Sequence, residues 1–157
     1  MALQDNYFPT LLLDQVNLWK TDSFTGVGVV FYSELKELPS AALGNDATPK
    51  PWLPVSGANA SARTLADVSN SASPWHDGFD MIDIRSQTLT HLSQFLAPPL
   101  HSLEHLPKAR PSGARQMTAL ISSMIEGIDY VGVLSTSGEI VVYQNGQAAA
   151  RVITKHE

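Results

Sequence analysis

A histidine and an aspartate stand next to each other before a glycine in residues 73–80, which read SPWHDGFD. The carboxylate of Asp77 is the hard oxygen ligand that Mg²⁺ or Mn²⁺ prefers beside phosphates, and it could equally orient a hydroxyl group. Asp-Gly is also ordinary turn chemistry, in which His76 would only hydrogen-bond the backbone. Taken alone, this segment favours a turn at the start of a strand over a metal site.

A second candidate site is the start of the helix predicted over residues 112–127. The first turn of a helix has free backbone N–H groups and carries the positive end of the helix dipole. Gly113 lets an anion approach closely and Arg115 adds a positive charge, so this turn could bind a phosphate group. The simpler interpretation is a core helix capped by Ser112 with one surface arginine, and it is favoured when the feature is taken alone.

A third pattern, HSLEH at residues 101–105, matches the H-x-x-E-H motif of a class of zinc proteases. In that motif two histidines bind the metal while the glutamate acts as a base. Prolines on both sides leave room for two helical turns at most, and no third ligand is identifiable. We therefore expect a short solvated turn with two exposed histidines. The sequence has no serine-hydrolase elbow, P-loop or Rossmann fingerprint either.

Taken together, the first two segments resemble the diadenylate cyclase domain family, the nucleotide-binding domain found at the N-terminus of the DNA-integrity scanning protein DisA. In that family a stretch like TPLHDGA enters a strand, a stretch like GTRHRAAL opens a later helix, and strands follow around SEETG. The matching segments here are SPWHDGF at 73–79, GARQMTAL at 113–120 and TSGEI at 136–140. Their order agrees with the family, and so do the helices and strands predicted around them.

The resemblance implies that two ATP molecules, held by two domains that meet face to face, are joined into cyclic di-AMP with release of pyrophosphate. It also implies that Asp77 serves an Mg²⁺ or Mn²⁺ ion and the attacking hydroxyl, and that the segment around Arg115 binds the phosphates. A homo-oligomer would then be expected. The nucleotide-binding residues carried over in this way are His76, Asp77, Gly78, Phe79, Gly113, Ala114, Arg115 and Gln116.

The sequence departs from the family pattern mainly at the phosphate-binding segment. Gln116 and Met117 stand where the family has a histidine and a second arginine, and Ala114 replaces a threonine. Residues 134–136 lack most of the family's serine and acidic groups. Because each charge-assisted hydrogen bond is worth about 1.5–3 kcal/mol, losing several would weaken triphosphate binding by orders of magnitude. Phe79, in place of alanine, adds bulk where adenine or ribose would have room.

Three hypotheses about function follow. We favour a catalytically degenerate domain that binds an adenine nucleotide or a cyclic dinucleotide as a sensor or regulatory module. The alternative is an active cyclase that uses Asp77 with a metal ion, and Arg115 with helix amides for the phosphates. The third is a scaffold for a protein partner, which is expected if Trp75, Phe79 and Met117 fill the space between the two motifs.

Hydrophobic periodicity predicts the elements that must position these residues. The chain length predicts one domain over residues 1–157. The order of the elements predicts the α/β (α+β) class, with a mixed, mainly antiparallel sheet flanked by helices. Residues 38–74 are expected to be a long excursion with little regular structure apart from a helix within 61–70, and residues 98–113 a connection. Helices are predicted at 9–19 and 112–127, and strands at 27–32, 77–84, 88–97, 130–134, 139–143 and 147–155, the last after an Asn-Gly turn.

Composition limits the classes of partner. The chain has 157 residues, 43% hydrophobic and 16% charged, as in a globular domain. A net charge of −5 without a basic cluster argues against binding a nucleic acid polymer. With no cysteine there is no disulfide, thiolate zinc site or cysteine nucleophile. Since the sequence has neither a signal peptide nor a long apolar run, we expect a cytoplasmic protein without membrane contact.

Overall fold

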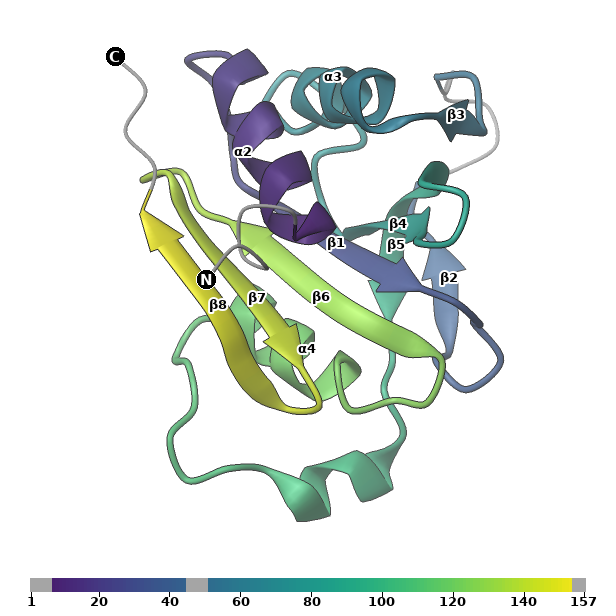
Figure 1. The fold of residues 1–157 in the computed structure, drawn as a ribbon, viewed down its shortest axis with the longest axis vertical. Coiled ribbons are helices and arrows are strands. Elements are labelled where there is room, and N and C mark those ends of the chain that lie inside the picture. Colours follow the sequence, from purple (N-terminus) through teal and green to yellow (C-terminus); the bar gives the residue numbers. More distant parts are fainter. Residues whose placement is uncertain (1–6, 45–50, 154–157) are drawn as a thin grey trace.

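The computed structural model describes residues 7–44 and 51–153, which form one sheet with helices on both faces (Figure 1). The elements, in chain order, are α2 (Phe8–Trp19), β1 (Val27–Tyr32), β2 (Ser40–Ala42), β3 (Val55–Ser56), α3 (Ala58–Val68), β4 (Phe79–Asp83), β5 (Thr88–Leu96), the 3₁₀ helix η1 (Leu100–His105), α4 (Ala114–Ser122), β6 (Ile128–Leu134), β7 (Glu139–Gln144) and β8 (Gln147–Ile153).

The strands follow the order β2-β5-β4-β1-β6-β7-β8, and β3 pairs with β5. Within the described ranges, β1 and β4 form the one parallel pair, and every other pairing is antiparallel. This confirms the predicted mixed, mainly antiparallel sheet flanked by helices. The parallel pair lies at the centre of the sheet, and both sequence motifs are arranged around it.

Strand β1 is buried on both faces because helices cover both sides of the sheet. Val27, Val29 and Phe31 pack in the cluster beneath α2 and α3, whereas Val30 belongs to the cluster beneath α4. In Figure 1, α4 is seen behind β6 and β7, away from α2 and α3. Burial on both sides explains why the β1 sequence is a continuous apolar run rather than an alternating one.

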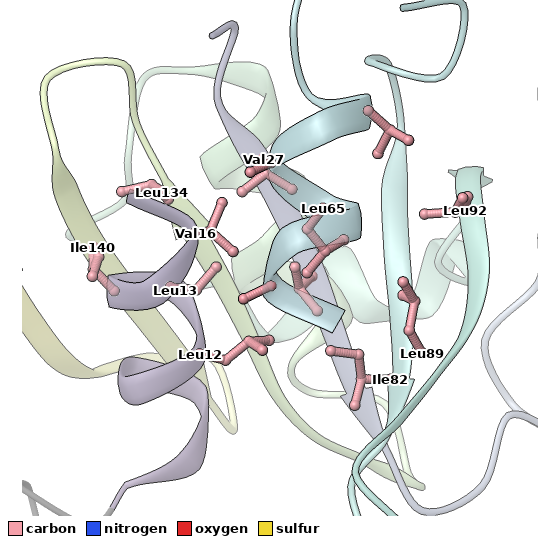
Figure 2. Close-up of a cluster of buried hydrophobic side chains, with 14 of the residues drawn as sticks. Leu12, Leu13, Val16, Val27, Leu65, Ile82, Leu89, Leu92, Leu134 and Ile140 are labelled. Carbon is pink, nitrogen blue, oxygen red and sulfur yellow. The ribbon is translucent and has the colours of Figure 1, made fainter. Parts of the chain in front are cut away.

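The spacing of the apolar residues in helix α2 matches its position over one face of the sheet. Pro9 lies in its first turn, where a missing N–H costs nothing. Leu12, Leu13 and Val16 are fully buried on the face that meets the sheet. Figure 2 shows these three side chains within the same cluster as Leu134, which ends β6 beside the start of β1.

The helix at 112–127 is shorter than predicted and is not capped by Ser112. The cap position is Gly113, without a side-chain hydrogen bond, and α4 ends at Ser122. The helix ends early because the hydroxyl of Ser123 donates to the carbonyl of Leu120 (2.6 Å), which competes with helical bonding. The following turns then tighten into i to i+3 bonds.

The excursion over residues 38–74 holds more regular structure than predicted. The predicted helix is present as α3, but the short strands β2 and β3 were missed. Both are edge strands that pair with β5, so their conformation depends on a partner distant in sequence. Residues 45–50, within this excursion, and 154–155, the end of the last predicted strand, lie outside the described residues.

Candidate functional site

Three chain segments meet at one edge of the sheet because of the strand directions. The starts of the parallel strands β1 and β4 lie at this edge, and the antiparallel β6 ends there. The parallel pairing begins at Val29 and Asp80, so the residues that precede them, Gly26 and Asp77 among them, lie at the same end of the two strands. The chain around Asp77 therefore enters β4 at the end of the sheet where β1 also starts. We call residues 25–26, 77–78, 113–115 and 134–138 the candidate site.

Arg115 reaches this edge from the first turn of α4. Its Nη1 donates to the carbonyl oxygen of Thr25 at 3.3 Å. Gly26 makes room for it, because a Cβ there would lie 2.7 Å from Nη1 and 3.3 Å from the carbonyl oxygen of Leu134. The structure therefore brings the two motifs recognised in the sequence, around Asp77 and Arg115, to the same edge.

The start of α4 is open toward solvent. Gly113 and Ala114 are exposed, and no side-chain hydrogen bond caps the helix at Gly113. The first helical bond runs from the amide of Met117 to the carbonyl of Gly113 at 2.9 Å. The free amide groups of the first turn and the positive end of the helix dipole therefore give this turn the arrangement of an anion-binding helix N-terminus.

Gln116 and Met117 add little to this anion site. The Gln116 side-chain oxygen accepts a 2.6 Å hydrogen bond from the hydroxyl of Tyr143 in β7, on the side away from β4. Met117 is half-buried and apolar. Among the residues of this first turn, Arg115 alone carries a charge.

Asp77 presents its carboxylate to solvent. The side chain is 73% exposed, and its Oδ1 lies 3.8 Å from Nδ1 of His76. That nitrogen is buried and has no hydrogen-bond partner within the part of the chain that the structure describes. The same residues hold no group of three histidine or acidic side chains suited to a metal. One exposed carboxylate is a hard oxygen ligand, and Mg²⁺ is commonly bound by one or two carboxylates together with a ligand's phosphates.

The aromatic residues of the first motif point into the core. Phe79 is 5% exposed and belongs to the cluster beneath α4. Its ring lies over Gly28, where a Cβ would come within 2.5 Å of Cε2. Trp75 packs in the cluster on the opposite face. Trp75 and Phe79 therefore lie on opposite faces of the sheet, so they do not fill one pocket together with Met117.

Gly78 has a conformation that other residues adopt at a cost. Its φ is 79°, and a Cβ would lie 2.7 Å from the carbonyl oxygen of Gln94. We expect Gly78→Ala to lower the free energy of unfolding by about 2–4 kcal/mol, from backbone strain plus the clash. Urea unfolding measures this. Gly57→Ala is the matched control, because Gly57 has a φ of 92° and no atom within 4 Å of a would-be Cβ; an equal loss in both variants would contradict the clash.

The sequence analysis missed Asp80 and Ser93, which are both buried beside the candidate site. Burial raises the pKa of the Asp80 carboxyl from 3.8 to about 7, against the opposing effects of a hydrogen bond from Ser93 and the charge of Arg115. One sequence feature could have identified Asp80, namely an acid in a strand between Phe79 and Met81. Nothing in the sequence pattern distinguishes Ser93.

The H-x-x-E-H segment lies elsewhere in the molecule. It forms the 3₁₀ helix η1, in which His101, Glu104 and His105 are exposed, as expected of a short solvated turn. The two histidines line a cavity of about 560 Å³ together with Glu37 and Glu126. No metal-binding group of three arises there from the described residues.

The fold and the site define an α/β domain with a helix N-terminus and an Asp-Gly turn at the start of the central parallel strands. Among solved structures, the chain is similar to a cysteine double mutant of DacA from Staphylococcus aureus, with 16% sequence identity and a TM-score of 0.53. The match covers 96% of this chain and 89% of that one. The overall fold is therefore that of DacA.

No protein-family model matches the chain, and no curated protein does either. Among the described residues, no helix is both long and apolar enough to cross a bilayer.

Proposed function

We propose that this chain is a diadenylate-cyclase-like domain that binds an adenine nucleotide or a cyclic dinucleotide as a sensor or regulatory module. The observation that carries the proposal is that Arg115 and the uncapped start of α4 lie at the same end of the central strands as the exposed carboxylate of Asp77. Support also comes from the fold, which is shared with DacA, a diadenylate cyclase.

The proposal of a degenerate catalytic site rests on charge. A triphosphate carries several negative charges, and the α4 start offers it one arginine and backbone amides. The neighbouring positions add no further cation, since Gln116 is bonded to Tyr143 and Met117 is apolar. We therefore propose that the site binds fewer phosphate groups of a nucleotide than an active cyclase must bind. The candidate contacts are the carboxylate of Asp77, the backbone of residues 76–79, the amides of residues 113–116 and the guanidinium of Arg115.

A divalent cation, Mg²⁺ or Mn²⁺, would enter with the nucleotide. Asp77 would hold it from the protein side, and the ligand's phosphates would complete most of its coordination. The ion would neutralise part of the phosphate charge, because the carboxylate and the phosphates would otherwise repel each other. Removal of the metal with a chelator is therefore expected to weaken binding of ATP more than binding of AMP.

Isothermal calorimetry with ATP, ADP, AMP and cyclic di-AMP, with and without Mn²⁺, tests the proposal. Binding of at least one of these ligands is expected, and Asp77→Asn should reduce the Mn²⁺ dependence without unfolding the protein, since the side chain is exposed. If none of the four ligands binds, the nucleotide-sensor proposal fails and a protein-interaction scaffold remains.

Active cyclisation of ATP is the second candidate function, and the exposure of Asp77 favours it. A carboxylate that is 73% exposed at a sheet edge is free to face a second domain, and a homo-oligomer would bring two such sites together. Incubation of concentrated protein with ATP and Mn²⁺, followed by chromatography, tests for cyclic di-AMP and pyrophosphate. Product that disappears in Asp77→Asn would establish the cyclase; nucleotide binding without product would leave the sensor.

A further inference from the structure

A carboxylic acid lies inside the central sheet, two residues beyond the candidate site. Asp80 in β4 is 4% exposed, and its neighbours Phe79 and Met81 both face the α4 cluster. Side chains alternate along a strand, so Asp80 faces the other side, as does Ile82. An apolar residue would pack there without the cost of desolvating a carboxyl group. The acid therefore calls for an explanation beyond folding.

The strand next to Asp80 contains a β-bulge. Phe79 pairs with Gln94, but Met81 pairs with His91, so two residues of β5 lie opposite the single residue Asp80. One of these two is Ser93, which has a φ of 53°. A non-glycine residue in this left-handed region is uncommon and must be held by its surroundings.

Every polar group of Ser93 is hydrogen-bonded. Its amide donates to Oδ1 of Asp80 at 2.9 Å, and its hydroxyl donates to the carbonyl oxygen of Asp77 at 2.8 Å. Its own carbonyl oxygen accepts the amide of Leu43 at 2.9 Å. Ser93 is 1% exposed, so these bonds are shielded from competing water. A continuous path of hydrogen bonds thus leads from the buried carboxyl to the backbone of the Asp-Gly turn.

We infer that Asp80 is a positioning residue: it holds the Ser93 bulge, and Ser93 in turn fixes the backbone of Asp77, so that the exposed carboxylate points into the candidate site. This inference rests on the proposed nucleotide-binding function for its purpose, but the hydrogen-bond path itself is independent of any ligand. The glycine that follows Asp77 has little freedom to compensate, since it packs against the backbone of Gln94.

Three variants separate this role from simple packing. Asp80→Asn keeps an oxygen that accepts a hydrogen bond from the Ser93 amide, so this conservative variant should retain the positioning role. Asp80→Leu keeps the size but removes the acceptor. Ser93→Gly removes the hydroxyl while suiting the positive φ, so it isolates the bond to Asp77 without adding backbone strain. Asp67→Asn, on the exposed side of α3, is the control for a change of charge alone.

The first readout is amide hydrogen exchange of the protein without ligand, and the second is the Kd for ATP with Mn²⁺. In Asp80→Leu we expect exchange at Ser93 and Gly78 to accelerate about tenfold or more, and ATP binding to weaken by about tenfold, whereas Asp80→Asn stays near the wild type in both. Ser93→Gly should loosen Gly78 and weaken binding similarly.

The outcomes distinguish the two proposals. If exchange changes as expected but the wild type binds no nucleotide, the positioning role stands and the proposed function fails. The inference is overturned if the wild type binds ATP and both Asp80→Leu and Ser93→Gly bind it equally well with unchanged exchange at Gly78. Should Asp80→Leu fail to fold, Ser93→Gly alone decides between these results.

Discussion

Replacing Arg115 by glutamine is expected to weaken nucleotide binding by about 10- to 150-fold. The substitution removes the one charged group of the α4 first turn, and a hydrogen bond to a charged partner contributes about 1.5–3 kcal/mol, with tenfold in Kd per 1.4 kcal/mol. Stability should change little, since among the described residues the side chain donates a single hydrogen bond, to the Thr25 carbonyl. Calorimetry on folded protein measures the Kd, and thermal unfolding checks the fold.

Arg85→Gln is the matched control for this prediction. Arg85 is exposed just beyond the opposite end of β4. Its replacement by glutamine therefore changes the net charge by the same amount at a position away from the candidate site. An equal loss of affinity in both variants would mean that Arg115 acts only through long-range charge. No loss in either would mean that phosphates bind elsewhere.

The second large effect concerns the pH dependence of stability. Burial raises the pKa of Asp80 from 3.8 to about 7, so the folded protein holds a proton that the unfolded chain releases between these values. The stability that comes from this group is present in full below about pH 4 and is lost as pH rises to 7. Between pH 5 and pH 8 the loss is about 3 kcal/mol, at about 1.4 kcal/mol for each pH unit up to the folded pKa.

Asp80→Asn removes this dependence, because the amide does not ionise. The difference in unfolding free energy between Asp80→Asn and the wild type should therefore grow by about 3 kcal/mol in favour of the variant from pH 5 to pH 8. Urea unfolding at several pH values measures it. Parallel curves for the two proteins would refute a neutral buried Asp80, and the exposed Asp67→Asn serves as the control with no expected divergence.

Local patterns predicted the main elements of the fold well. The central strand β1 and the helices α2 and α3 were predicted from patterns of residues that are close together in the sequence. The short edge strands β2 and β3 exist through pairing with β5, and no local pattern records that contact. The end of α4 was also missed, because a hydroxyl of Ser123 that bonds the helix backbone decides it.

The candidate site shows the same division. The sequence singled out Asp77 and Arg115 as candidates, and the structure places both segments at the end of the sheet where β1 and β4 start. The sequence could not show that the Phe79 ring lies in the core over Gly28, since that depends on which face of β4 the residue occupies. The support from Ser93 depends on a bulge in another strand and is equally invisible to local patterns.

We propose above all that an adenine nucleotide or a cyclic dinucleotide binds where β1, β4 and α4 start. The most direct test is an amide NMR titration of labelled protein with ATP and Mg²⁺, and in parallel with cyclic di-AMP. The largest chemical-shift changes are expected at Gly26, Gly78, Gly113 and Arg115. Shifts centred on the cavity beside His101, or no shifts with either ligand at millimolar concentration, would contradict this binding site.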